Sequence, residues 1–132
     1  MDAAQALADL TEISSQIESA VLFDEQGAVL GATLADGSAA QALARGAAEL
    51  LAEAAAFRSS DAAVTQLEAS THEGSVFVVR DGSRRIAATT GPSPTVGLVF
   101  YDLKSALRGT EESAPATPKP RPRKKKEPVD EA

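Results

Sequence analysis

The sequence predicts a small domain of helices and strands in the order α-β-β-α-β-β-β-α. Three observations lead to this prediction. Apolar residues recur at helical spacing in three segments. Two short runs are apolar at consecutive positions, as in strands that are covered on both faces of a sheet. Turns that contain glycine, of which Asp81-Gly82 is the strongest, lie between the strand candidates.

Chain length and charge limit the classes of protein that fit. The 132 residues leave room for one domain, expected at 1–109, and a tail at 110–132. The first segment carries 7 basic and 14 acidic side chains, and the tail carries 6 and 5. Because binding to a nucleic-acid duplex needs a basic footprint, the acidic domain is a poor candidate for that role.

The absence of cysteine excludes a disulfide framework and thiolate metal sites. The acidic N-terminus lacks the features of an export signal, and no stretch approaches the roughly 20 apolar residues of a membrane span. We therefore expect a cytoplasmic protein.

The first three elements follow from spacing and turns. Apolar residues at three- and four-residue intervals predict an amphipathic helix at about 3–16, with Asp2 as its N-cap. Two strands are expected at 20–23 and 28–34, on either side of a glycine-containing turn at 24–27.

The central elements begin at Ser38, which has the spacing of a capping box with Gln41 and opens a helix predicted to end near Phe57. Strands are then expected at three segments, 64–71, 75–80 and 85–90. The first of these is the most polar, and polar strands usually lie at sheet edges.

The last segment, 94–108, has the propensity of a strand but the periodicity of a helix. Its apolar residues fall on one helical face. Ser93-Pro94 resembles a helix start, and Gly109 stands where a C-cap glycine would. We predict a third helix.

The second helix has an unusual distribution of side chains. A narrow polar stripe contains Gln41, Arg45, Glu49 and Glu53. A face of large apolar groups contains Leu43, Leu50, Ala54 and Phe57. A face of mostly small groups contains Ala44, Ala48, Ala52 and Ala55, with Leu51 at its border. We expect the large face to cover the sheet and the small face to pack closely against a second subunit. The alternative is that alanine is present only as the best helix former.

Three stretches resemble the Roadblock family, which comprises dynein light chains and bacterial partners of Ras-like GTPases. They are AVLFDEQGAVL at 20–30, VFVVRDG at 76–82 and TVGLVFYDL at 95–103. The last is similar to the family's Gly-Leu-Val-x-Tyr ending. The likeness depends on the order and spacing of these stretches and spans about residues 2–109.

The resemblance implies an α+β sandwich: a five-stranded antiparallel sheet with the second helix on one face and the first and third on the other. It also implies a homodimer in which the second helices pack together and the strand at 64–71 pairs with its twin. Together with the small helix face, this gives a predicted dimer interface of Ala44, Ala48, Leu51, Ala52, Ala55, Val64, Gln66 and Glu68. Family members are scaffolds, motor-complex subunits or GTPase regulators. The resemblance therefore implies a homodimer that binds and regulates, or scaffolds, a small Ras-like GTPase.

The sequence offers little for catalysis. His72 is the sole histidine and is expected in a solvated turn. Asp24 and Glu25 are adjacent but also belong to a turn, and the chain has no P-loop motif. Arg85 could reach the phosphates of a partner, although a charged hairpin end is the simpler interpretation. We predict no enzyme activity, catalytic residue, metal or cofactor. A ligand-sensing domain of similar shape is a weaker alternative, because no polar-lined pocket is evident.

The tail at 110–132 contains five prolines and no aromatic residue, so we expect it to be disordered. Six of the eight residues at 119–126 are basic: Lys119, Arg121, Arg123, Lys124, Lys125 and Lys126. Such a run can bind nucleic acid, an anionic membrane surface or the acidic face of the domain itself, or remain a solvated tail. Without aromatic residues its nucleic-acid binding would be non-specific and salt-sensitive. An alternative function is therefore a tethering adaptor.

Overall fold

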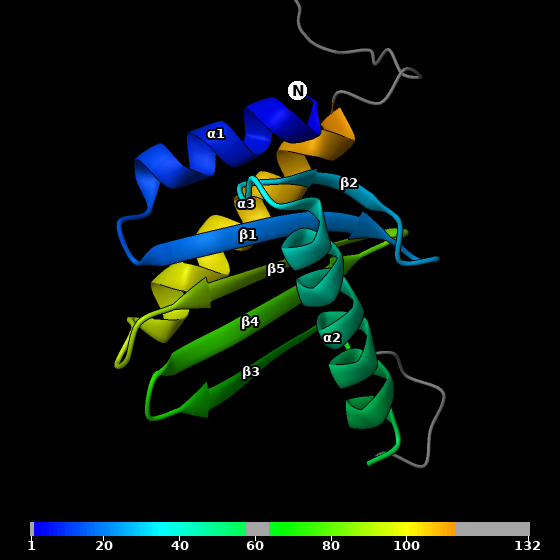
Figure 1. The fold of residues 1–132 in the computed structure, drawn as a ribbon, viewed down its shortest axis with the longest axis vertical. Helices are drawn as coiled ribbons and strands as arrows, with labels where there is room; N and C mark the ends of the chain where they lie inside the picture. The colour runs from blue at the N-terminus through cyan, green and yellow to red at the C-terminus, as the bar shows by residue number, and fades with distance from the viewer. Residues whose placement is uncertain (1, 58–63, 113–132) are drawn as a thin grey trace, which may run out of the picture.

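The computed structural model describes residues 2–57 and 64–112 (Figure 1). The elements are α1 (Ala3–Ile13), β1 (Ile17–Asp24), β2 (Val29–Ala32), α2 (Gly37–Ala55), β3 (Gln66–Thr71), β4 (Gly74–Asp81), β5 (Arg84–Thr90) and α3 (Val96–Glu112). Their order confirms the predicted α-β-β-α-β-β-β-α arrangement.

The five strands form one antiparallel sheet in the order β2-β1-β5-β4-β3. β1, β5 and β4 are paired on both sides, and β2 and β3 are the edges. The interior pairing places Ala88 of β5 opposite Ala20 of β1 and Phe77 of β4. The two runs that are apolar at consecutive positions therefore lie in interior strands, as expected for strands that are covered on both faces.

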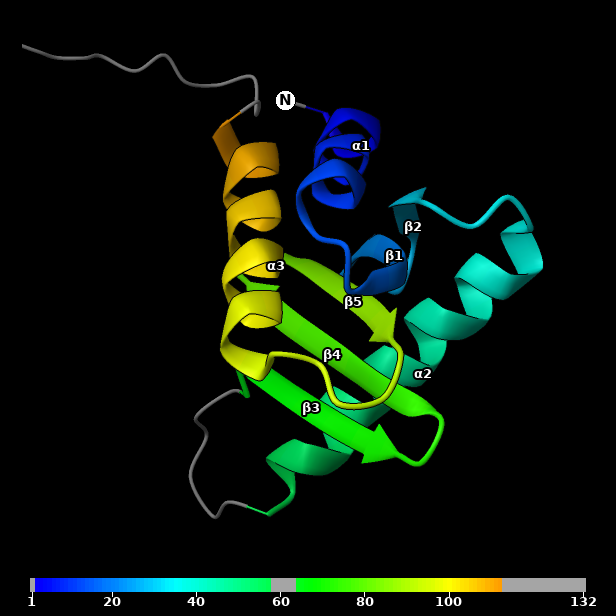
Figure 2. The ribbon, with the colours of Figure 1, turned by 90° about the vertical axis from the view of Figure 1, so that its left-hand side faces the viewer.

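Helices cover both faces of the sheet, with α1 and α3 on one side and α2 on the other (Figure 2). This confirms the predicted α+β sandwich. The core under α1 and α3 is formed by Leu7, Leu10, Ile17, Ala20, Leu22, Phe77, Val79, Ile86, Ala88, Val99, Leu103 and Leu107. The core under α2 is formed by Val21, Phe23, Ala40, Ala44, Ala47, Leu51, Val78 and Ala87.

The first helix is shorter than predicted. It ends at Ile13, and the backbone N–H of Ser14 caps it by donating to the carbonyl of Leu10. Asp2 is the N-cap, as predicted, and its side chain accepts a hydrogen bond from the N–H of Gln5. Ile17 does not extend the helix but begins β1. Its four-residue spacing from Ile13 fits a helix, although the residue belongs to a strand.

The other helix ends also differ from prediction. The N-cap of α2 is Asp36, whose carboxylate accepts a 2.9 Å hydrogen bond from the N–H of Ser38. α3 begins at Val96 and continues past Gly109 to Glu112, so the predicted C-cap is wrong and the fold extends beyond residue 109. The rest of the predicted tail, residues 113–132, lies outside the described residues.

Gly74 fixes the start of β4 beside the end of β5. Its φ of 152° is rarely adopted by L side chains, and a Cβ at this position would overlap the carbonyl oxygen of Thr90. We expect Gly74→Ala to lower the free energy of unfolding by about 2 kcal/mol or more, measured by denaturant titration. Gly46→Ala in α2, where a Cβ would meet nothing, should instead raise it by about 0.5–1 kcal/mol. Equal effects at the two positions would contradict this account.

Candidate functional site

One part of the sheet is left without a helix above it. α2 packs chiefly against β1, β2 and β5, and it crosses the sheet from the β2 edge toward the start of β3 (Figure 1). On the α2 face, β3 presents Leu67 and Ala69, and β4 presents Val76 opposite Ala69. These three apolar side chains are half-buried. The sheet face beside β3 is therefore only partly covered.

Within the described residues β3 is also an open edge, because β4 is the one strand that pairs with it there. Gln66 and Glu68 are exposed on the face opposite Leu67. The carboxylate of Glu68 accepts a hydrogen bond of 3.2 Å from the hydroxyl of Ser75 on β4. An edge strand presents backbone N–H and C=O groups to which a further strand can pair. The predicted polar edge strand is thus found, beginning at Gln66 and not at Val64.

The orientation of α2 corrects the predicted assignment of its faces. Four small or medium residues of the helix pack on the sheet core: Ala40, Ala44, Ala47 and Leu51. They lie against larger sheet side chains, such as Phe23 and Val78, so the sheet supplies most of the volume and the alanines allow close approach. Ala44 is 0 % exposed and Leu51 is 8 % exposed. Both are enclosed within their own domain, and their prediction as contacts with another subunit is wrong.

The remaining small residues line one flank of α2. Ala48, Ala52 and Ala55 border a hollow that also involves Glu25 of the β1–β2 turn and the half-buried Val64. A neighbouring hollow of about 360 Å³ contains Gln41 and Arg45 with the same turn. This flank therefore faces the β1–β2 turn and not the free edge at β3. A symmetric contact centred on β3 would not bring these alanines together.

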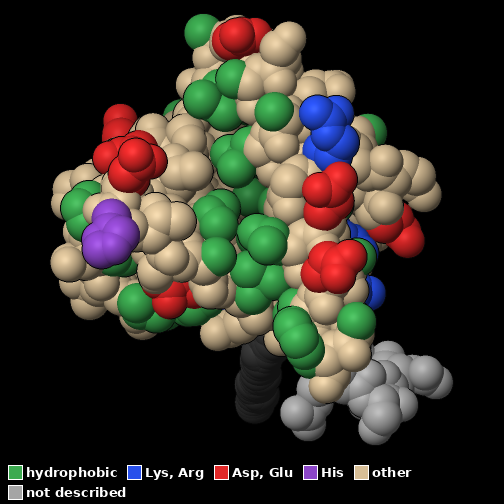
Figure 3. All heavy atoms as spheres, turned by 60° about the horizontal axis from the view of Figure 1, so that its bottom comes forward, with side chains coloured by type: hydrophobic (Ala, Val, Ile, Leu, Met, Phe, Trp, Pro, Cys, Tyr) green, Lys and Arg blue, Asp and Glu red, His purple; other side chains and the backbone are tan. Residues whose placement is uncertain are grey.

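The opposite flank of α2 carries Leu43, Leu50 and Phe57, which recur every seven residues and so line up along the helix. Leu43 and Leu50 are half-buried, and Phe57, just after the helix, is 87 % exposed. Hydrophobic side chains form a continuous band between two groups of charged residues on this side of the molecule (Figure 3). We call the set Leu43, Leu50, Phe57, Leu67, Ala69 and Val76 the apolar strip.

The distribution of side chains on the helix predicts that Leu43, Leu50, Ala54 and Phe57 pack on the domain's own sheet. In the structure, only Leu43 among them packs against the sheet core under α2. The seven-residue recurrence of leucine and phenylalanine is the sequence signal that marks this flank as apolar along its length.

Two arginines lie near the hollow beside Ala48. Arg80 and Arg85 come from β4 and β5, and Arg85 donates a 3.0 Å hydrogen bond to the carbonyl of Gly82. Partial burial lowers the pKa of Arg85, as does the positive charge of Arg80, whereas Glu25 and Asp24 raise it. An arginine keeps its charge despite such shifts. This surface therefore carries charges of both signs and is not a simple anion site.

The candidates for chemistry are dispersed. His72 is exposed in the turn between β3 and β4, as predicted. The carboxylate of Asp24 accepts hydrogen bonds of 2.9 Å from the N–H groups of Gln26 and Ala28, so it stabilises the β1–β2 turn.

Over residues 2–57 and 64–112, no three carboxylate, histidine or cysteine side chains lie close enough together to bind a metal ion. In the same ranges, no helix has the length and apolar character needed to cross a bilayer.

Comparison with solved structures identifies the fold. The Roadblock/LC7 domain from Streptomyces avermitilis superposes with a TM-score of 0.75 at 20 % identity, covering 85 % of this chain and 97 % of that one. The chain has the Roadblock/LC7 fold. Gliding protein mglB from Thermus thermophilus gives 0.70 at 17 % identity, covering 83 % and 86 %. Myxococcus xanthus MglB gives 0.62 at 15 % identity, covering 83 % of each chain. No family model matches the sequence, and a search of curated proteins finds no significant match.

The corrected orientation of α2 in this Roadblock/LC7 fold predicts unequal effects of two matched substitutions. Ala44→Leu inserts volume into the closed core under α2 and should lower the free energy of unfolding by about 1–3 kcal/mol. Ala52→Leu on the exposed flank should change it by no more than about 0.5 kcal/mol. Urea titration followed by circular dichroism measures both. A larger loss for Ala52→Leu would mean that the helix is turned the other way.

Proposed function

We propose that this protein is a non-enzymatic homodimeric interaction domain that binds and regulates, or scaffolds, a small Ras-like GTPase. The observation that carries the proposal is the apolar strip beside the open β3 edge. Monomeric proteins rarely expose a contiguous apolar patch next to unpaired strand backbone, because both promote association. A surface of this kind is typical of a protein that works in contact with another chain.

A second copy is the simplest partner for the strip. Antiparallel pairing of two β3 strands is symmetric, as a two-fold dimer requires, and would join the two sheets into one. The same symmetry would bring the Leu43, Leu50 and Phe57 flanks of the two α2 helices toward each other across the junction. Gln66 and Glu68 would stay at the paired edge, as predicted from the sequence, whereas Ala48, Ala52 and Ala55 would remain outside the contact.

The GTPase is proposed as the partner of this dimer. The resemblance to the Roadblock family supports the class of partner, and the lack of a P-loop motif means that any GTPase must be a separate chain. The exposed side of α2 presents Arg45, Glu49 and Glu53 next to one another, pointing away from the sheet. Two such helices side by side would form a rigid, charged platform, which is the surface we propose for the GTPase.

Phe57→Asp tests the dimer. Phe57 is almost fully exposed in the single domain, so the change should leave folding intact while placing a charge in the interface. Loss of a central aromatic contact typically costs about 2 kcal/mol or more, which weakens a dimer roughly 30-fold. Sedimentation velocity at micromolar concentration should show a dimer for the unaltered protein and a monomer for the variant. Leu98→Asp, an exposed apolar residue of α3, is the matched control and should stay dimeric. A monomeric unaltered protein would overturn the proposal.

The GTPase claim is tested with purified small Ras-like GTPases from the same cells, each loaded with GDP or a non-hydrolysable GTP analogue. The dimer should bind at least one of them and prefer one nucleotide state, measured by calorimetry. Arg45→Glu, on the proposed platform, should weaken that binding, and Arg84→Glu, on β5, should not. Equal affinity for both states, or no binding at all, would contradict a regulatory role.

Deleting residues 113–132 should preserve binding to the GTPase, whereas the tethering alternative predicts that this deletion abolishes attachment to nucleic acid or membrane.

A further inference from the structure

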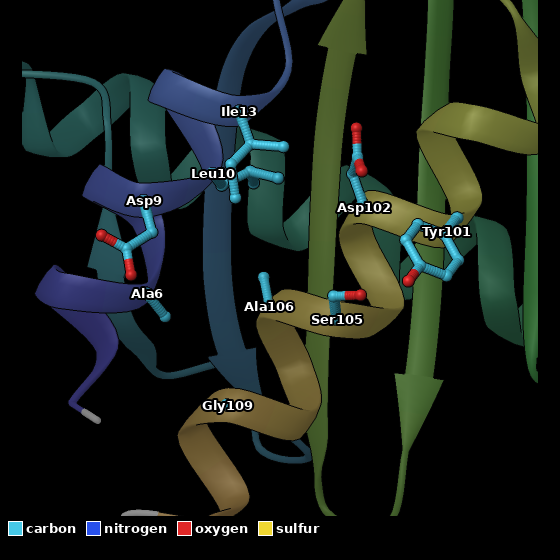
Figure 4. Close-up of a pocket in the computed structure, with 9 residues that line it drawn as sticks. All are labelled: Ala6, Asp9, Leu10, Ile13, Tyr101, Asp102, Ser105, Ala106 and Gly109. Atoms are coloured by element: carbon cyan, nitrogen blue, oxygen red, sulfur yellow. The ribbon is translucent and has the colours of Figure 1, made fainter.

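A second apolar surface lies on the opposite side of the molecule, between α1 and α3. It is a groove of about 300 Å³, shown in Figure 4. Its lining residues are Ala6, Asp9, Leu10, Ile13, Tyr101, Asp102, Ser105, Ala106 and Gly109. Two large apolar side chains at its rim are strongly exposed, Ile13 at 71 % and Tyr101 at 64 %. The groove shares no residue with the apolar strip.

The groove contains a carboxylate, that of Asp102, which pairs with no cation among the described residues. Asp102 is only 7 % exposed, yet within the described part of the chain its side chain has no hydrogen-bond or ion-pair partner. Asp9 stands on the α1 wall, where Gln5 donates a 3.0 Å hydrogen bond to it. The oxygens of Asp102 are not closed off from solvent, and with Asp9 they give the groove a negative charge that favours a cationic ligand.

The described domain does not supply that cation. The first 44 residues contain no lysine or arginine, so α1 is purely acidic. Lys104 and Arg108 belong to α3, but they line a different hollow, together with Arg80 and residues of β3. The groove thus combines an exposed aromatic ring, apolar walls and uncompensated negative charge.

We propose that residues 113–126 of the same chain dock in this groove. The segment leaves directly from the end of α3, whose side chains form one wall of the groove. It contains prolines and six basic residues, and thus the positive charge that the groove lacks. Proline-rich segments bind aromatic-lined grooves as a preformed polyproline II helix, at a low entropic cost.

The length of the segment fits the groove. From Glu112 back to Tyr101, α3 rises about 16 Å at ~1.5 Å per residue. A polyproline II segment advances ~3.1 Å per residue, so about six residues, 113–118, cover the same distance. Pro115 and Pro118 are three residues apart and lie on one side of such a helix, facing the groove. This placement puts Lys119 beside Asp102, near Ile13 at the end of α1, and the further basic residues extend beyond the groove.

A spin label tests the proposal in the full chain. Because the protein has no cysteine, Thr117→Cys provides a single attachment site for a nitroxide. Docking predicts that the label broadens the amide NMR signals of Ile13 and Tyr101 and leaves those of Leu67 and Val76 unchanged. The broadening should be lost at about 1 M salt, where the Debye length is only ~3 Å. Broadening that is confined to the last turn of α3, or that appears on the β3 side, would overturn the proposal.

Two groove variants, a control variant and a mixing experiment separate this docking from other contacts. Asp102→Asn removes the charge and Ile13→Ser removes an exposed apolar contact, so each should reduce the broadening at Tyr101. Glu73→Gln, in the β3–β4 turn, changes charge by the same amount away from the groove and should have no effect. In a mixture of isotope-labelled chains without nitroxide and unlabelled chains with nitroxide, the groove signals should stay sharp. Broadening in that mixture would assign the contact to another copy and refute docking within one chain.

Discussion

The molecule is organised around a sheet whose interior strands are apolar on both faces. Such a sheet requires cover on both sides, and the part of the chain that the structure describes covers it with three helices. α1 and α3 share one face, but α2 is alone on the other and crosses mainly β1, β2 and β5. The face next to β3 is left with half-buried apolar groups. Fully burying a leucine- or phenylalanine-sized side chain is worth about 1.5–3 kcal/mol, so the proposed contact of this surface with another chain would be stabilising.

The two sides of the domain differ in chemical character. On the α2 side, apolar groups lie next to unpaired strand backbone, and that combination suits a partner that brings its own strand and helix. On the other side, the groove between α1 and α3 combines Tyr101 with an isolated carboxylate at Asp102, which suits an extended cationic segment. Because the two surfaces share no residue, the proposed partner contact and the proposed docking of the C-terminal segment would not compete.

Most of the fold could be predicted from the sequence because strand runs, turns and helical periods are local signals. The orientation of α2 could not be predicted in this way, because the helix has two apolar flanks. Its own sequence does not indicate which flank packs on the sheet. In the structure Ala44 packs in one cluster with Phe23 and Val78 beneath the helix, whereas Leu50 is half-buried on the flank. The groove could not be predicted from the sequence either, because it forms only where α1 and α3, which are distant in sequence, lie side by side.

Amide hydrogen exchange of the two sheet edges, measured over a range of protein concentrations, distinguishes a paired β3 edge from a free one. If β3 pairs with its twin, the outward-facing amides of β3 will exchange more slowly as the concentration rises through the dimer dissociation constant. The amides of β2, the other edge of the same sheet, will exchange at a constant rate and serve as an internal control. Rates at β3 that do not depend on concentration would contradict the account.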